Sequence, residues 1–91
     1  MSVYVDELIK WPNARGIFKD GSCHLSADTT EELHAFAAKL RLKRSWFQNH
    51  KLLAHYDLVP SKREQAIKLG AIAEGAMEGA RRRRAERKNE P

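Results

Sequence analysis

A capped amphipathic helix is the feature that most constrains the fold of this chain. Thr29, followed three residues later by Glu32, has the spacing of a capping box, in which the two residues satisfy each other's free backbone N–H groups. Apolar side chains then recur at intervals of three and four residues, at Leu33, Phe36, Ala37 and Leu40. A stripe of this kind is buried against another element. The sequence therefore predicts a helix over residues 30–41 that packs on a neighbouring layer.

Segments typical of short β-strands lie on both sides of this helix. They contain β-branched, aromatic or alternating apolar residues and are bounded by turn-forming residues such as Asp20-Gly21. We expect strands at residues 2–6, 22–26, 42–48 and 71–73, with a brief extended piece at residues 17–18.

A second helix is expected to begin at Pro60-Ser61. Ser61 and Glu64 repeat the capping-box spacing, and Gly70 suits the position just after a helix end. Residues 55–58, which precede this helix, are expected to be extended or a loop.

The alternation of strands and helices predicts an α/β fold. We expect a small three- or four-stranded parallel or mixed sheet with two main helices and a basic C-terminal extension. Residues 1–73 are predicted to form one compact domain. Residues 74–91 are predicted to be a basic tail, helical or disordered, because Gly75 and Gly79 each weaken a helix by about 1 kcal/mol.

The charge is unevenly distributed. Residues 81–91 hold six basic and two acidic residues, a net charge of +4, whereas residues 1–80 carry a net charge of +1. No acid occurs between Glu32 and Asp57, where five cations fall. Basic segments of this sort attract phosphate-bearing partners such as nucleotides or nucleic acid, although a solvated surface explains them equally well.

Several function classes are disfavoured by composition. No apolar run approaches the roughly 20 residues of a membrane span, so we expect no membrane partner, and the N-terminal residues lack the pattern of a signal peptide. Cys23 is the one cysteine, which excludes an internal disulfide and a cysteine-rich zinc site and favours a cytoplasmic location. A single domain of 91 residues has a marginal core, so a homo-oligomer or a complex with a host protein is also possible.

Seven short segments together resemble a known family. They are Val3–Asp6, Cys23–Leu25, His34–Leu40, Arg44–Gln48, His55–Leu58, Ser61–Arg63 and Leu69–Ala71. Over about residues 1–73 the chain is similar to domain-of-unknown-function family 4031, small proteins of bacteria and bacteriophages. The resemblance implies a cytosolic bacterial or phage protein and no established activity, and residues 74–91 fall outside it.

The first candidate site is a phosphate-binding helix start. Ser61, Lys62 and Arg63 stand where free N–H groups and the helix dipole favour an anion, and where cations are otherwise mildly unfavourable. His55 and Asp57 come just before them. We therefore predict that these five residues bind a nucleotide or nucleic acid, while a solvated helix start capped by Ser61 is the structural alternative.

The second candidate is a metal-dependent phosphodiesterase or nuclease. Asp6, Asp28 and Asp57 would hold Mg²⁺ or Mn²⁺, with His24 or His55 as a further ligand or a base. The expectation depends on parallel strands, whose carboxyl ends lie along one edge of a sheet. A hairpin between the first two strands would separate these carboxylates.

Other residues carry weaker hypotheses. Arg81, Arg82, Arg83 and Arg84 would bind nucleic acid through its phosphates, or would only keep the tail soluble. Of the neighbouring Trp46 and Phe47, at most one is expected to be free to stack on a base. Trp11 would mark the surface of a protein–protein adaptor or inhibitor, for example one directed against host defence. A Cys23–His nucleophile and base pair has no third group to orient it.

Overall fold

The computed structural model describes residues 2–10, 12–13 and 16–88. The strands are β1 (Val3–Val5), β2 (Cys23–Ala27), β3 (Gln48–Asn49), β4 (Ala54–Leu58) and β5 (Ile72–Ala73). The helices are α1 (Thr30–Lys39), α2 (Pro60–Lys68) and α3 (Ala76–Lys88), and two 3-10 turns are η1 (Gly16–Phe18) and η2 (Arg44–Trp46). None of the described helices is long and apolar enough to cross a membrane.

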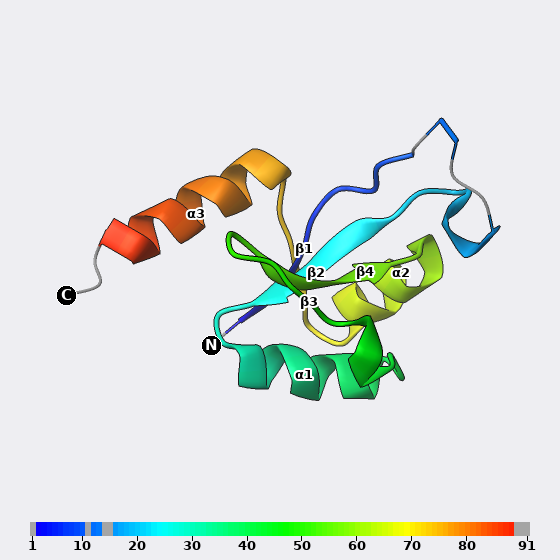
Figure 1. Ribbon diagram of the computed structural model, residues 1–91, viewed down its shortest axis with the longest axis horizontal. Coiled ribbons are helices and arrows are strands. Elements are labelled where there is room, and N and C mark those ends of the chain that lie inside the picture. The colour runs from blue at the N-terminus through cyan, green and yellow to red at the C-terminus, as the bar shows by residue number, and fades with distance from the viewer. Residues whose placement is uncertain (1, 11, 14–15, 89–91) are drawn as a thin grey trace.

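The described strands form a mixed sheet of five strands in the order β3-β4-β2-β1-β5 (Figure 1). β1 is antiparallel to β2, β2 and β3 are each antiparallel to β4, and only β1 and β5 run parallel. The α/β class and the mixed sheet are as predicted, but the sheet has one strand more than expected. The added strand is β4, which lies beside β2 in the interior of the sheet.

α1 confirms the predicted apolar stripe and the Thr29 half of the predicted capping box. Thr29 adopts an extended conformation, and its Oγ1 accepts a hydrogen bond of 3.2 Å from the backbone N–H of Glu32. The four residues of the apolar stripe are all buried against the sheet. The helix stops at Lys39 rather than residue 41, because Arg41 turns into the left-handed region with a φ of 61°.

α1 and α2 end in the same way. Behind α1 the N–H of Leu42 bonds the carbonyl of Ala37, and behind α2 the N–H of Ala71 bonds that of Ala66. These are the long hydrogen bonds of a Schellman motif, in which the residue after the helix cap is left-handed. Gly70 fills that position after α2 with a φ of 109°, as the sequence predicted.

The start of α2 differs from the prediction. Val59 is the N-cap and has no side-chain capping bond, and Pro60 is the first helical residue. Proline suits this position because its missing N–H would have had no partner within the helix. Ser61 is therefore inside the helix, and the capping box predicted for Ser61 and Glu64 is wrong.

Two predicted extended segments are turns. Residues 44–46 of the expected third strand form η2, closed by a 2.9 Å hydrogen bond from the N–H of Trp46 to the carbonyl of Lys43, and only Gln48 and Asn49 pair as a strand. Residues 17–18 belong to η1, which begins at Gly16 with a φ of 66°. In both places local i to i+3 hydrogen bonds replace pairing with a neighbouring strand.

The two faces of the sheet have opposite character. α1 and α2 cover the face that carries Val5, Leu25 and Leu58, which are fully buried, while α3 lies on the other side of the strands (Figure 1). Because side chains alternate along a strand, the face toward α3 receives every second residue. Those residues are polar: Tyr4, Asp6, His24, Ser26, His55 and Asp57. We call this the polar face.

Candidate metal centre

Strand register brings the polar side chains together in two rows. His24 of β2 pairs directly with Asp57 of β4, and the N–H of Asp6 bonds the carbonyl of His24 on the other side. Residues directly opposite each other on neighbouring strands point to the same face. Asp6, His24 and Asp57 thus form one row across three strands, and the next row contains Ser26 and His55.

His24, His55 and Asp57 form a cluster with the spacing of metal ligands. One ligand atom from each residue lies within 4.8 Å of the other two. The Nε2 atom of His55 is 3.5 Å from the Oδ1 atom of Asp57, and the two imidazole rings meet edge to face with their centroids 4.6 Å apart. These three residues are called the His24–His55–Asp57 centre below.

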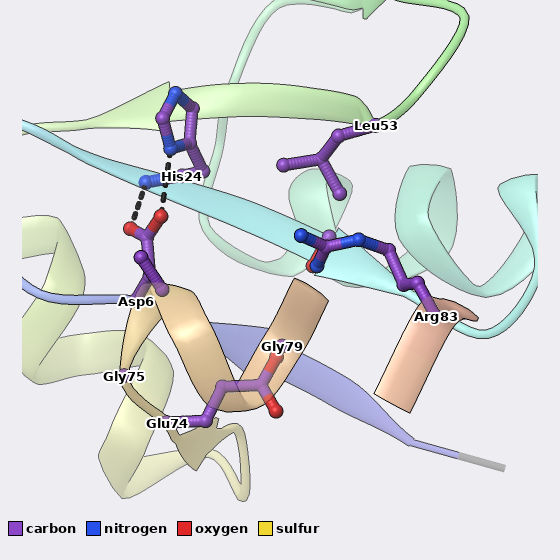
Figure 2. Close-up of a pocket in the computed structure, with 9 residues that line it drawn as sticks. Asp6, His24, Leu53, Glu74, Gly75, Gly79 and Arg83 are labelled. Carbon is purple, nitrogen blue, oxygen red and sulfur yellow. Dashed lines mark hydrogen bonds and ion pairs between the residues drawn. The ribbon is translucent and has the colours of Figure 1, made fainter. Parts of the chain in front are cut away.

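Each histidine of the centre is held through its Nδ1 atom. The Nδ1 of His24 lies 2.7 Å from Oδ2 of Asp6, and the backbone N–H of His24 donates to Oδ1 of the same carboxylate at 2.6 Å (Figure 2). The Nδ1 of His55 lies 2.8 Å from the carbonyl oxygen of Leu53. Both partners accept hydrogen bonds only, so in the neutral form of each ring Nδ1 carries the proton and Nε2 keeps a lone pair. That tautomer presents Nε2 to a metal ion.

Asp6 and His24 also change each other's pKa. Burial raises the pKa of Asp6, but the hydrogen bonds from the ring and backbone of His24 outweigh it, and the net pKa is lowered. The hydrogen bond to Asp6 raises the pKa of His24 against the opposing effect of burial. A carboxylate behind a histidine makes its ring a more basic ligand, as in carboxylate–histidine–metal arrangements.

The centre has a donor set that proteins use for catalytic metals. Two imidazoles and one carboxylate bind Zn²⁺ in several hydrolases and Fe²⁺ in oxygenases, and they leave coordination positions for water or substrate. Asp57 is oriented for this role, because its Oδ2 accepts a 2.5 Å hydrogen bond from Nε2 of Gln48 while Oδ1 faces His55.

A cavity of about 170 Å³ lies beside His24, between the polar face and the start of α3. Asp6, His24 and Ser26 line it from the sheet, and Arg83 reaches it from α3 (Figure 2). The guanidinium of Arg83 is close enough to oppose the protonation of His24 electrostatically. The cavity thus places one cation, Arg83, and one further carboxylate, Glu74, near a candidate ligand of the metal.

Arg82 holds α3 against the sheet. Its guanidinium carbon lies 3.6 Å from the ring centroid of Tyr4, and its Nη2 is 3.1 Å from Oε1 of Glu74. A further contact of 3.6 Å joins Nη1 to Oδ1 of Asp28. This anchor on Arg82 determines where the next residue, Arg83, enters the cavity.

The three predicted metal carboxylates do not meet. The N–H of Asp28 bonds the carbonyl of Ser2, so Asp28 lies at the opposite end of β1 from Asp6, about 13 Å away for four residues of strand. There its carboxylate accepts hydrogen bonds from the Tyr4 hydroxyl at 2.9 Å and the Ser2 N–H at 2.8 Å. The expected shared edge fails because β1 and β2 are antiparallel.

The five residues of the predicted phosphate site do not come together either. His55 and Asp57 adjoin each other on the polar face, but Lys62 donates to the carbonyl of Leu40 at 2.8 Å, and Nε of Arg63 donates to the carbonyl of Asp6 at 2.9 Å. Ser61 is exposed in the first turn of α2. The five residues therefore point to several separate places.

The remaining candidates are placed as follows. Cys23 is buried on the core face, away from the polar face, and burial raises its pKa to about 12. Arg81 and Arg84 are exposed on α3, whereas Arg82 and Arg83 face the sheet. Trp11, on which the adaptor hypothesis depends, lies outside the described residues.

Sequence reasoning missed the role of Asp6 as the partner of His24, and it missed Glu74. Gln48 was not predicted to bond Asp57, and Arg83 was named only as one of the four arginines of residues 81–84. The available signal was the alternation of His55 and Asp57 with apolar residues in Ala54–Leu58, which is typical of a strand with one polar face. Pairing that strand with residues 23–27 aligns His24 with Asp57.

Comparison with known proteins gives a family and no activity. A search of the curated proteins and a search of the solved structures returned no significant match. A family model described as "Protein of unknown function (DUF4031)" matches residues 3–86. The match extends thirteen residues beyond the end of the resemblance judged from the sequence, and it includes Glu74, Arg82 and Arg83. The chain belongs to the DUF4031 family of proteins of unknown function.

Proposed function

We propose that this protein is a metal-dependent hydrolase of a phosphate-bearing substrate, a nucleotide or nucleic acid, with its metal held by the His24–His55–Asp57 centre. The observation that carries the proposal is that a hydrogen-bond acceptor engages the Nδ1 atom of both histidines. Their Nδ1 atoms are engaged by Asp6 and by the Leu53 carbonyl, while the ligand atoms of the centre converge within 4.8 Å. A bacterial or phage origin and a cytoplasmic location belong to the same proposal.

The type of metal follows from the donor set. Imidazole suits Zn²⁺ and Fe²⁺, carboxylate suits Mn²⁺, and Mg²⁺ prefers ligand sets made of oxygen alone. We therefore favour Zn²⁺ or Mn²⁺ over Mg²⁺. A bound ion of this kind lowers the pKa of a coordinated water and polarises a phosphoryl oxygen.

The type of substrate follows from the charge next to the centre. Arg83 lines the cavity beside His24, and a guanidinium binds phosphate oxygens through paired hydrogen bonds. In hydrolysis the oxygen of a water would form a bond to phosphorus while the bond from phosphorus to the leaving oxygen breaks. The attacking water would release its proton to solvent, and solvent would supply the proton that the leaving oxygen needs.

The proposal is tested by hydrolysis of 4-nitrophenyl phosphate and bis(4-nitrophenyl) phosphate after removal of metal with a chelator and reloading with Zn²⁺, Mn²⁺ or Mg²⁺. We expect turnover with Zn²⁺ or Mn²⁺ that His24→Ala and Asp57→Ala abolish. Arg83→Gln should weaken substrate binding while metal remains bound.

The matched control is His50→Ala, since His50 is an exposed histidine outside the centre. Turnover that survives His24→Ala and Asp57→Ala, or that falls equally in His50→Ala, would contradict the proposal. So would an enzyme that binds Zn²⁺ or Mn²⁺ but hydrolyses neither these esters nor any nucleotide.

A further inference from the structure

A basic groove lies at the end of the sheet where α1 stops and α2 begins. It has a volume of about 510 Å³, and its described lining includes four cations and no acid. The cations are Lys39, Arg41, Lys62 and Lys68. A concave surface lined by charges of one sign concentrates the field and attracts ligands of the opposite sign.

A second cavity adjoins this groove and shares Lys62 with it. Its volume is about 470 Å³, and its walls are mostly apolar, with Phe18 and Trp46 as the aromatic members. The Trp46 side chain is 49% exposed, and the ammonium of Lys43 lies 5.7 Å from its ring centroid. We refer to the two cavities together as the basic–aromatic groove.

Helix electrostatics account for only part of this charge. Lys39 and Lys68 lie in the last turns of α1 and α2, where cations offset the helix dipole, and Lys62 donates to a terminal carbonyl of α1. Arg41 directly follows the C-cap of α1, where a cation also offsets the dipole, but its backbone conformation is unusual for an arginine. It holds a φ of 61° at a position that glycine fills after α2, and an arginine there keeps a charge at the groove at some cost in backbone strain.

The groove also reaches the candidate metal centre. Asp57 lines the aromatic cavity, and the same carboxylate lies 3.5 Å from His55. Gln48, which orients Asp57, lines that cavity as well. A chain bound along the groove would therefore run past a ligand of the metal.

We propose that the basic–aromatic groove binds single-stranded nucleic acid, with backbone phosphates on its cations and a base stacked on Trp46. Cations next to an exposed aromatic ring suit an unpaired strand, because a base within a duplex has no free face to stack. The inference rests on the proposed function for the fate of the strand, which would be cleaved at the His24–His55–Asp57 centre, but binding is measurable without metal.

The test uses fluorescence anisotropy of a short labelled oligothymidylate with the full chain in chelator. Trp46→Ala should weaken binding at least about fivefold, since stacking of one base is worth about 1–3 kcal/mol. Each lost cation should lower the slope of log affinity against log salt by about 0.7.

Arg41→Gly is the decisive variant, because it removes a cation and relieves the left-handed residue at once. We expect it to melt at a higher temperature than the wild type and to bind the oligonucleotide more weakly. Lys51→Gln, which removes an exposed charge outside the groove, is the control and should bind as the wild type does.

Three results would overturn the inference. They are no binding of the oligonucleotide by the wild type, binding by Arg41→Gly and Trp46→Ala that equals that of the wild type, and binding of polyglutamate as strong as that of the oligonucleotide. The last result would indicate an acidic protein partner. His24→Ala separates the two proposals, because it should still bind the oligonucleotide in chelator. A wild-type protein that binds the oligonucleotide but no metal would count against the proposed function alone, and a wild-type protein that binds metal but no oligonucleotide would count against this inference alone.

Discussion

Asp6 determines which nitrogen of His24 is available to a ligand. Its carboxylate receives both the ring Nδ1–H and the backbone N–H of His24, so the imidazole has one orientation and one tautomer. The Leu53 carbonyl does the same for His55. The chemistry proposed for the centre therefore depends on two acceptors that would not themselves touch the metal.

Asp6→Asn should weaken metal binding about 10- to 100-fold, as loss of a partner behind a metal-binding histidine typically does. The amide is a poorer acceptor and no longer raises the pKa of His24. Isothermal titration with Zn²⁺ or Mn²⁺ measures the change. Asp20→Asn, a substitution of an exposed aspartate, should leave the affinity unaltered, and an unaltered affinity in Asp6→Asn would show that Asp6 does not support the centre.

The same pair predicts how stability without metal depends on pH. The pKa of His24 is raised above 6.5. Its contribution to the stability of the folded protein is therefore complete below pH 6.5 and is lost as pH rises through the pKa of His24 in the folded state. Asp6 has a pKa lowered from 3.8, so its contribution is present above that value and is lost as pH falls through the folded pKa. The pair should stabilise most between about pH 4 and 6.5.

Urea unfolding in chelator at several pH values measures this contribution. The difference between wild type and Asp6→Asn should be largest inside that window and no more than about 1 kcal/mol, because His24 is partly exposed to solvent. A difference that stays constant from pH 4 to pH 9 would contradict the assignment.

Cys23 should be inert in the folded protein. Burial raises its pKa to about 12, so almost no thiolate exists near neutral pH, and its side chain is buried on the core face. Mass spectrometry after iodoacetamide treatment at pH 8 should show no alkylation until urea is added. Rapid alkylation of the native protein would revive a role for Cys23 as a nucleophile.

At the scale of elements, the sequence predicted those elements that are determined by interactions between residues close in the chain. α1 was predictable because its cap and its apolar stripe lie within twelve residues. The sequence did not decide between a strand and a loop for β4. Its alternate polar residues, His55 and Asp57, are explained only by β2, which lies beside them. Strand direction is equally non-local, and the antiparallel pairing of β1 and β2 separated Asp28 from Asp6.

α3 is the element whose docking the sequence did not reveal. Arg82 contacts Tyr4, Glu74 and Asp28, which are spread over much of the chain. Arg82→Ala should destabilise the protein by roughly 1–3 kcal/mol and speed hydrogen exchange of the α3 amides, since a partly buried charge network loses its central cation.

Arg84→Ala is the matched control for that change, because Arg84 lies on the exposed side of α3. The candidate metal ligands lie on β2 and β4, so Arg82→Ala should retain metal affinity while it weakens the substrate contact proposed for Arg83. Equal exchange in the two variants would show that Arg82 does not anchor the helix.

At the scale of the whole molecule, the sheet separates the apolar core from the candidate site. α1 and α2 bury the apolar face, and the polar face carries the candidate centre with α3 beside it (Figure 1). The fold groups several of the predicted functional residues differently from the groups that the sequence predicted. His24 joins His55 and Asp57, Asp6 supports His24, and Asp28 helps to anchor α3.

The central claim is that three residues from β2 and β4 hold one metal ion. Its most direct measurement is titration of the chelator-treated protein with Co²⁺, followed by visible absorption, alongside isothermal titration with Zn²⁺. We predict one ion per chain for the wild type and for His50→Ala, and loss of that ion in His24→Ala, His55→Ala and Asp57→Ala. Binding that all three variants retain, or no binding by the wild type, would contradict the claim.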